Sequence, residues 1–212
     1  MGCAVATPKP KRRRKGLSTP RPYGELSAAA KARARDHWRE KGWTWDEWDS
    51  EQLTEFFKQE LDQEWGIDEA ELSWSLGYCQ GDGVSFTANL NLEKVAAKID
   101  TVAEIMRQAE LLEAAAGWQY SPEWNASIKG GSVDVQCCAM DYDDPSRDAQ
   151  RLLDELASAM EAELEQVYKQ ACRRLEKLGY ADIEYHDSDE HLDGELTAND
   201  QYLFTVEGEF HS

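Results

Sequence analysis

The sequence predicts an α+β fold in which helices pack on a central antiparallel sheet of hairpins. Two pairs of segments alternate apolar and polar residues on either side of glycine turns, as the strands of β-hairpins do. Between and after these pairs lie segments whose apolar residues recur every three or four positions, which indicates helices with one buried face. The 212 residues include eight Trp, eight Tyr and five Phe, enough apolar material for one substantial domain or two small ones.

We expect three parts along the chain: a flexible basic arm over residues 1–22, a helical region over 23–66 and an α+β domain over 67–212. The arm contains seven Lys or Arg, four Pro and no acid, so it has no residues with which to build a core. Its central basic run consists of Lys11, Arg12, Arg13, Arg14 and Lys15. Nucleic acid contact is expected only through residues 9–15, and the arm could instead fold back on the acidic remainder.

The helical region contains two expected helices. An alanine-rich segment from Leu26 to about Lys41 has high helix propensity and is followed by Gly42, a typical residue after a helix end. A second helix is expected from an N-cap at Ser50 to Gly66. Its apolar positions are Leu53, Phe56, Phe57 and Leu61. Before it, three tryptophans alternate with acids, at Trp43, Trp45 and Trp48; they are expected either to pack against this helix or to form an exposed docking patch.

The first expected hairpin joins residues 72–78 to 84–92 through Gly81, Asp82 and Gly83. A glycine-rich turn raises the question of phosphate binding, but a phosphate loop precedes a helix and usually includes a Lys. Here a strand follows and no Lys is near, so we interpret the turn as structural. The glycines are expected to adopt positive φ, and the Asp82 side chain to bond its own backbone.

The remaining elements follow in order. A helix is expected over residues 92–117, then a second hairpin that turns at Lys129, Gly130 and Gly131. A long helix should begin after Asp144-Pro145 and end near Gly179, with Leu152 in its buried stripe. A short acidic helix or loop at 188–200 and a strand at 201–210 complete the chain.

Charge is the most informative bulk property. The formal charge is −19, of which +7 lies on residues 1–22 and −26 on residues 23–212. Such a negative field repels nucleic acid and membrane surfaces and attracts basic partners, although acidity also serves solubility alone. The candidate binding residues form two clusters, namely Asp46, Glu47, Asp49, Glu51, Glu55, Glu60, Asp62 and Glu64, and then Asp187, Asp189, Glu190 and Asp193.

No motif predicts catalysis, a cofactor or a metal site. The segment from His186 to His191 has two imidazoles and three carboxylates, but its spacing does not place both His on one helical face. Five Cys, with Cys137 and Cys138 adjacent, indicate reduced thiols rather than a disulfide framework. No segment is apolar enough to span a bilayer, so we expect a cytoplasmic protein. Because no catalytic signature is present, we expect it to be non-enzymatic.

The segment LSWSLGYCQGDGVSF, residues 72–86, together with the C-terminal residues, resembles a family of small bacteriophage and prophage proteins described as antitoxins of toxin–antitoxin stability systems. The C-terminal resemblance rests on Leu175, Glu176, Lys177, Ser188, Asp189, Glu190, Asn199, Tyr202, Phe204, Thr205, Glu207 and Gly208. It covers roughly residues 65–212; the arm and first helix depart from it, and Cys79 stands where the family often has Ser. The resemblance implies an α+β protein of phage origin with no catalytic residues.

Three functions are therefore open. The first is an inhibitor of host takeover or counter-defence type, whose acidic surface engages a basic, nucleic-acid-binding host protein, with DNA mimicry as one form. The second is an antitoxin that neutralises a cognate toxin, and the third is a virion-associated protein whose arm contacts the packaged genome. The sequence leaves the identity of the partner open, and also whether the chain forms a homodimer.

Overall fold

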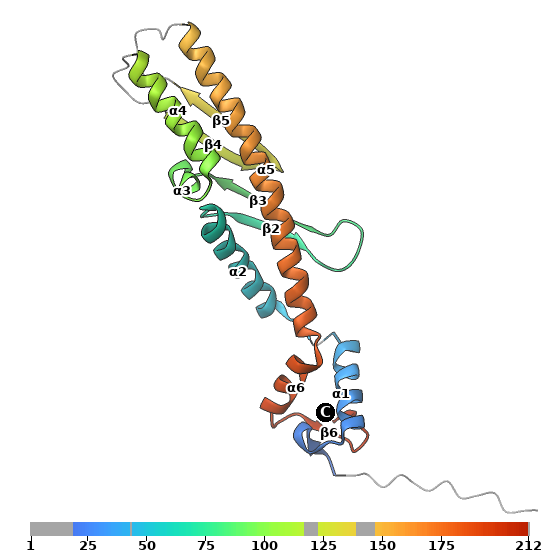
Figure 1. Cartoon of the computed structure of the whole chain (residues 1–212). Coiled ribbons are helices and arrows are strands. Elements are labelled where there is room, and N and C mark those ends of the chain that lie inside the picture. The colour runs from blue at the N-terminus through green and yellow to red at the C-terminus, as the bar shows by residue number, and fades with distance from the viewer. Residues whose placement is uncertain (1–18, 43, 117–122, 139–146, 212) are drawn as a thin grey trace, which may run out of the picture. The chain divides into compact units, whose positions relative to one another are not determined.

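The computed structural model describes residues 19–42, 44–116, 123–138 and 147–211 (Figure 1). The predicted basic run at residues 11–15 lies outside these ranges. The fold is α+β, as predicted, with helices and two antiparallel sheets. The chain divides into two compact units: unit one comprises residues 1–44 and 186–212, and unit two comprises residues 45–185.

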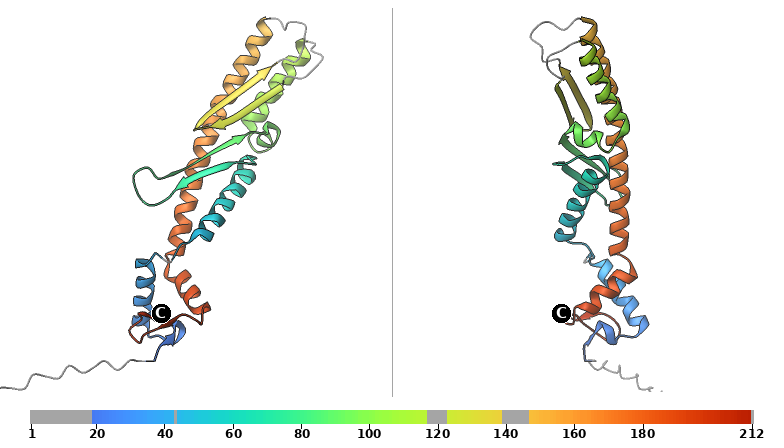
Figure 2. Two further views of the ribbon diagram at one scale, coloured as in Figure 1. Left: turned by 180° about the vertical axis from the view of Figure 1, so that it is seen from behind. Right: turned by 60° about the vertical axis from the view of Figure 1, so that its left-hand side comes forward.

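Unit two consists of a four-stranded antiparallel sheet with helices on one face. Its elements are α2 (Glu47–Trp65), β2 (Glu71–Ser75), β3 (Gly83–Asn89), α3 (Leu92–Ala96), α4 (Asp100–Ala116), β4 (Glu123–Lys129), β5 (Ser132–Cys138) and α5 (Arg147–His186). The strand order is β2-β3-β4-β5, so each hairpin predicted from the sequence is present and the two hairpins join between β3 and β4. Figure 2 shows α4 and α5 on one face of this sheet.

The core of unit two lies between the sheet and its helices. Phe86 of β3 packs on Tyr168 of α5, with ring centroids 5.0 Å apart, and Phe57 of α2 packs on Trp74 of β2 at 6.2 Å. Alternate residues of β5, Val133 and Val135, are buried, as period-2 alternation predicts. The opposite face of the sheet presents polar residues such as Ser73, Ser85, Asn89, Asn125 and Gln136.

Helix α2 begins four residues earlier than predicted. Asp46, not Ser50, is its N-cap: the Asp46 carboxylate accepts from the Asp49 N–H, and the Asp49 carboxylate accepts from the Asp46 N–H, which is a capping box. The Ser50 hydroxyl instead donates to the Asp46 carbonyl and accepts from the Trp45 indole N–H at 2.8 Å. The predicted end is correct, because Gly66 has φ +68°.

Helix α5 continues through Gly179 to His186, so the predicted end near Gly179 is wrong. A Cβ at Gly179 would lie 2.3 Å from Leu76 Cδ1 and 2.9 Å from Phe57 Cζ. The glycine therefore allows α2 and β2 to approach the helix, and it does not end it. Leu152, predicted to be buried, is exposed, and Leu153 takes the buried position.

Two further segments differ from the sequence prediction. The helix expected over 92–117 is two helices, α3 and α4, separated by three residues, with Asn91 capping the first. Strand β2 ends at Ser75, although the sequence predicts a strand to residue 78, and Tyr78 is exposed with φ +56°.

Unit one consists of the helix before residue 44 and the C-terminal residues. Its elements are β1 (Arg21–Pro22), the 3₁₀ helix η1 (Tyr23–Glu25), α1 (Ala28–Glu40), α6 (Asp189–Ala198), β6 (Leu203–Phe204) and β7 (Phe210–His211). The predicted final strand is thus a short hairpin, and β6 also pairs with β1. The core of unit one comprises Tyr23, Leu26, Ala30, Ala34, Trp38, Leu192, Leu196 and Phe204.

The expected boundary at residues 66–67 therefore differs from the division in the structure. Helix α2 packs with the sheet of unit two, whereas α1 packs with α6, 150 residues later in the chain. Within the described residues, no helix is both long and apolar enough to cross a membrane.

Candidate functional site

The first predicted acidic cluster lies on α2 and at its N-cap. Helical periodicity places Trp48, Glu51, Glu55 and Asp62 on the side of the helix opposite the buried residues Leu53, Phe57 and Leu61. We call these four residues the α2 face. All four are exposed, and the Trp48 side chain is 63% exposed.

The carboxylates of this cluster differ in how far they are already paired. Glu55 forms an exposed ion pair with Lys58 at 2.6 Å, of a kind that contributes little to stability. Glu60 and Glu64 lie 3.0 and 3.8 Å from Arg174 of α5 and so support packing within unit two. Among the described residues, Glu51 and Asp62 form no ion pair, and these two with Glu55 are the carboxylates best placed for a partner.

The three tryptophans have different environments. Trp45 is half-buried against the core and donates to Ser50, as the packing interpretation predicts. Trp48 projects from the α2 face, as the docking interpretation predicts, and Phe56, 39% exposed, lies two turns further along. Trp43 lies outside the described residues.

The second acidic cluster belongs to an ion-pair network in unit one. Arg35 of α1 lies 2.9 Å from Asp189 and 2.6 Å from Asp193, and Arg39 lies 2.6 Å from Asp189 and donates to the Asp187 carbonyl at 2.8 Å. Asp193 also accepts from the Tyr23 hydroxyl. Two of the predicted binding carboxylates are thus paired inside the unit, between α1 and α6.

This network makes the stability of unit one depend on pH. Burial by itself would raise the pKa of Asp193, but the hydrogen bonds from Tyr23 and Arg35 together outweigh it, so this pKa is lowered. The hydrogen bond from Arg39 lowers the pKa of Asp189. Burial, followed by the bond to Asp193, raises the pKa of Tyr23 to about 12. A lowered carboxyl pKa contributes stability that is present above the unfolded value, near 3.9, and is lost as the pH falls through the folded value. The raised phenol pKa contributes stability that is present below about pH 10 and is lost as the pH rises toward 12.

We therefore expect the unfolding free energy of unit one to fall, through these carboxyl groups, as the pH is lowered from 6 to 3 and below. This change can be measured by denaturant unfolding at each pH, with hydrogen exchange of peptides from α1 and α6 as the readout. Asp193→Asn should flatten the dependence, since its amide does not titrate. Asp200→Asn, which changes a carboxylate outside the network, is the control; equal slopes in both variants would contradict the assignment.

The turn at residues 81–83 is held by several hydrogen bonds to the side chain of Asp82. Gly81 has φ +104°, and the Asp82 carboxylate accepts from the Cys79 N–H at 2.9 Å, Tyr180 at 2.9 Å and Ser75 at 3.2 Å. The bonds from Cys79, first from its backbone, hold the pKa of Asp82 well below its usual range, and the bond to Asp82 raises the pKa of the Cys79 thiol. A thiol kept protonated by a carboxylate is a poor nucleophile. The turn has the geometry of the predicted structural role.

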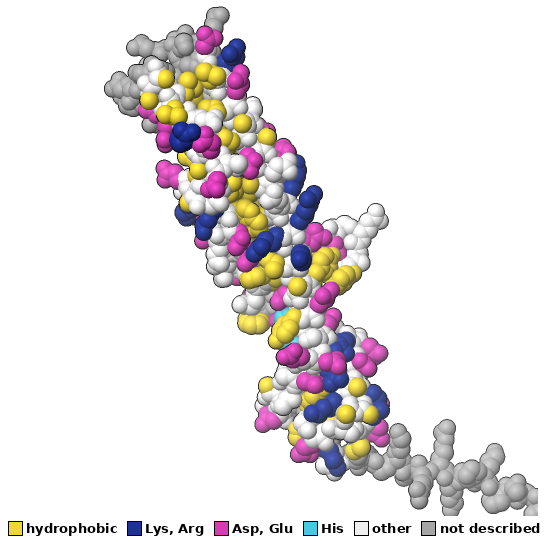
Figure 3. Space-filling model, in the orientation of Figure 1, with side chains coloured by type: hydrophobic (Ala, Val, Ile, Leu, Met, Phe, Trp, Pro, Cys, Tyr) yellow, Lys and Arg dark blue, Asp and Glu magenta, His cyan; other side chains and the backbone are white. Residues whose placement is uncertain are grey.

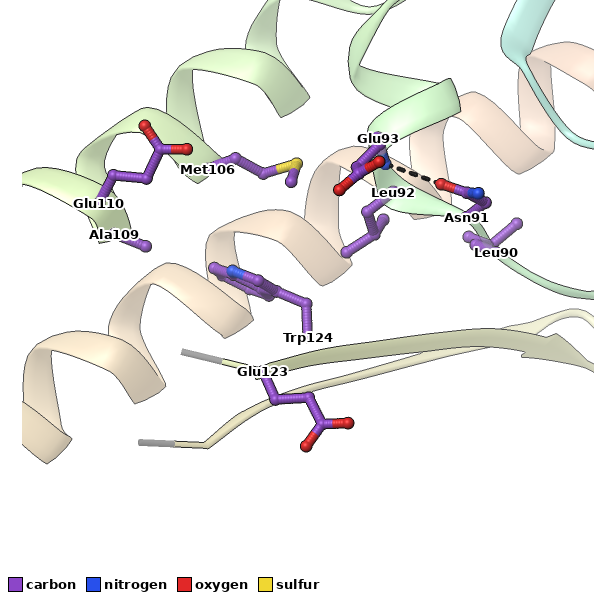
Figure 4. A pocket seen from close by; sticks show the side chains of 9 residues that line it. All are labelled: Leu90, Asn91, Leu92, Glu93, Met106, Ala109, Glu110, Glu123 and Trp124. Carbon is purple, nitrogen blue, oxygen red and sulfur yellow. Dashed lines mark hydrogen bonds between the residues drawn. The ribbon is translucent and has the colours of Figure 1, made fainter. Parts of the chain in front are cut away.

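A pocket of about 610 Å³ lies between α3, α4 and the start of β4 (Figure 4). Its apolar lining includes Leu92, Met106 and Trp124, and Figure 4 shows the Trp124 ring directed toward the helices while Glu123 points away. Glu93 and Glu110 contribute carboxylates from the helices, and no Lys or Arg lines the pocket among the described residues. Such a pocket favours a group that is both apolar and cationic.

The described residues include no group of three or more His, Cys, Asp or Glu placed to hold a metal ion. His186 and His191 do lie together, with ring centroids 4.5 Å apart, and His191 is 3.8 Å from Glu195. Cys137 is buried in β5, and Cys172 is half-buried in α5.

Sequence reasoning missed two features of these surfaces. The two pocket acids lie on different helices, so only the fold brings them together. Phe56 was assigned to the buried stripe because four apolar positions fitted a 3-4 spacing; the angle between adjacent residues leaves Phe57 buried and turns Phe56 outward.

Comparison with known proteins gives a family without an activity. No curated protein and no solved structure shows significant similarity to the chain. The antitoxin resemblance therefore stays a prediction. A family model does match residues 44–193, which is well over half of the chain and includes all of unit two. The chain belongs to the family described as a domain of unknown function, DUF8835.

Proposed function

We propose that the protein is a non-enzymatic binding protein whose α2 face engages a basic surface of a partner protein. The observation that carries this proposal is the combination on one exposed helix face of Glu51, Glu55 and Asp62 with the aromatic Trp48. Interfaces commonly have a large aromatic anchor surrounded by polar contacts, and Trp is the residue most enriched among such anchors.

The wider charge distribution supports a basic partner. Helix α2 contains seven carboxylates and a single Lys. The pocket of Figure 4 has the carboxylates of Glu93 and Glu110 and no cationic side chain among the described residues. Complementary charge accelerates encounter and selects the partner, while the aromatic contact supplies most of the short-range affinity.

Charge density indicates which kind of basic surface fits. At about 1.5 Å per residue, the 19 residues of α2 span about 28 Å. Duplex DNA of that length has about 17 charges, roughly three times the net charge of α2. The helix therefore suits a protein surface with a few Lys or Arg better than a groove built for DNA, and mimicry of DNA would need carboxylates from elsewhere.

The test is capture of partners by the tagged full chain from its host cells, at low and at high salt. Replacing Glu51, Glu55 and Asp62 by their amides should lower the captured amount of a specific partner about tenfold or more, and added salt should do the same to the unchanged protein. The matched control is Asp148→Asn, Asp154→Asn and Glu155→Gln, which makes the same charge change on exposed residues of α5.

Three results would contradict the proposal: equal loss in the control variant, binding that does not change with salt, or capture that requires none of the three carboxylates. If added duplex DNA displaces the protein from its partner, and more DNA displaces more of it, then the partner surface is one that binds nucleic acid. That outcome would support the host-inhibitor form of the proposal over the antitoxin form.

A further inference from the structure

Cationic and aromatic side chains gather on a second surface of unit two, although the chain as a whole is strongly acidic. Arg173 and Lys177 lie one turn apart on α5, both exposed, and form no ion pair among the described residues. Tyr180 follows on the same face of the helix. In Figure 3, dark-blue side chains gather over the part of α5 beside the loop between β2 and β3. We call Arg173, Lys177, Tyr180 and Tyr78 the α5 patch.

The patch is hollowed and held in place by the loop. A depression of about 520 Å³ is lined by Arg173, Lys177 and Tyr180 together with Glu176, Ala181 and Glu184 of the same helix. The rings of Tyr78 and Tyr180 stack with centroids 4.7 Å apart, and the Tyr180 hydroxyl donates to Asp82 at 2.9 Å. The turn that the sequence predicts to be structural thus fixes an aromatic surface next to Arg173 and Lys177, which form no ion pair within the described part of the chain.

The spacing of this patch is complementary to that of the α2 face. On α2, Trp48, Glu51 and Glu55 are separated by three and then four residues. On α5, Arg173, Lys177 and Tyr180 are separated by four and then three. In an antiparallel pair of helices the order of one is reversed, so each residue of one set meets a residue of the other. Trp48 meets Tyr180, Glu51 meets Lys177 and Glu55 meets Arg173.

The same register continues without conflict. The next positions place Lys58 opposite Gln170 and Asp62 opposite Gln166, and both glutamines are exposed. Five successive pairs therefore contain an aromatic pair, two opposite-charge pairs, two charge–amide pairs and no pair of like charges. The alternating 3-4 spacing is that of two helices packed along a common seam.

We propose that the α5 patch binds the α2 face of a second copy of the chain, as an antiparallel helix pair. The inference goes beyond the proposed function, because it assigns a surface that the proposed function does not use, and it shares only the α2 face with it. Since the seam is mostly polar and each copy has a formal charge of −19, the association is weak and favours concentrated protein at moderate salt. A basic partner that occupies the α2 face would compete with it.

Sedimentation velocity of the full chain over a range of concentrations tests the proposal. Glu51→Lys with Glu55→Lys should raise the dimer dissociation constant about tenfold, and Arg173→Glu with Lys177→Glu should do the same. All four substitutions together should restore the original value, because both sets of charges are reversed. Failure of the combined variant to recover, or a chain that is monomeric at every concentration, overturns the proposal.

A single position provides an independent test that leaves the fold undisturbed. Gln170 is exposed on α5 and faces Lys58 in the proposed register. Gln170→Glu should strengthen the dimer a few-fold and Gln170→Lys should weaken it a few-fold, although general repulsion between acidic proteins predicts the reverse order. The reverse order would overturn the proposal.

The outcome is also distinguishable from failure of the proposed function. Arg173→Glu with Lys177→Glu should weaken self-association about tenfold and leave capture of a basic partner through the α2 face intact. If that variant loses partner capture but not self-association, the assignment of the α5 patch is wrong while binding of a basic partner stands.

Discussion

Gly66→Ala should lower the unfolding free energy of unit two by about 3 kcal/mol. Gly66 ends α2 with φ +68°, a conformation that costs an L-residue about 1 kcal/mol or more. A Cβ there would also lie 2.4 Å from the carbonyl oxygen of Lys94 and 2.6 Å from its carbonyl carbon. Because these are backbone atoms, no side-chain rotation relieves the overlap, and forcing such contacts typically costs a further 1–3 kcal/mol.

Helix α3 cannot simply move away from the added methyl group. Its buried residues Leu92 and Val95 pack into the core, and Lys94 forms an ion pair with Asp68 just after the turn. The short helix is therefore fixed on both sides. The overlap must then be relieved by displacing the backbone at the end of α2. Gly66 connects the surface proposed to bind a partner to the sheet beneath it.

A matched control separates overlap from backbone conformation. Gly130 has φ +58° in the same unit, and no atom lies within 4 Å of a Cβ built on it. Gly130→Ala should therefore cost about 1 kcal/mol, the conformational part alone. Denaturant unfolding of the two variants, monitored by the tryptophans, gives the difference; equal costs would show that the contact with Lys94 is easily relieved.

Local patterns in the sequence were sufficient for most elements of unit two. Alternation around Gly81–Gly83 and Gly130–Gly131 predicted both hairpins, since one face of each strand is buried. The 3.6 periodicity predicted α2 and α5. The errors arise where contacts distant in sequence decide the result: Gly179 resembles a helix end, yet its role is to admit Leu76 and Phe57.

The division into units was beyond local reasoning for a similar reason. Nothing near α1 in the sequence indicates that its partners are residues 188–211, and the long helix α5 separates the two segments. The acids of α6 were interpreted as a free surface because Arg35 and Arg39, about 150 residues earlier, could not be placed against them. On α2 the sequence placed the acids on the right helix, but it did not separate the exposed Glu51, Glu55 and Asp62 from Glu60 and Glu64, which lie against Arg174 of α5.

Phe204→Ala should unfold unit one while unit two keeps its structure. Phe204 is fully buried, and its ring packs edge-to-face on Tyr23 and on Phe210, each with centroids 5.7 Å apart. Removing a buried phenyl ring typically costs about 3–5 kcal/mol. Among the described residues, the core of unit one has eight buried residues, and small cores supply a net stability of the same size.

Hydrogen exchange by peptide provides the decisive measurement for Phe204→Ala. Peptides from α1, α6 and the β6–β7 hairpin should lose protection, and peptides from β3, β4 and the middle of α5 should keep it, because the contacts of Phe204 lie within unit one. Val206→Ala in the same hairpin, at a side chain that is 45% exposed, should change neither set. Since Phe204 belongs to unit one and the α2 face to unit two, Phe204→Ala should also retain partner binding if that face acts from unit two alone. Loss of protection in both units together would show that they fold as one, and the pH dependence expected of the Arg35 network would then apply to the whole chain.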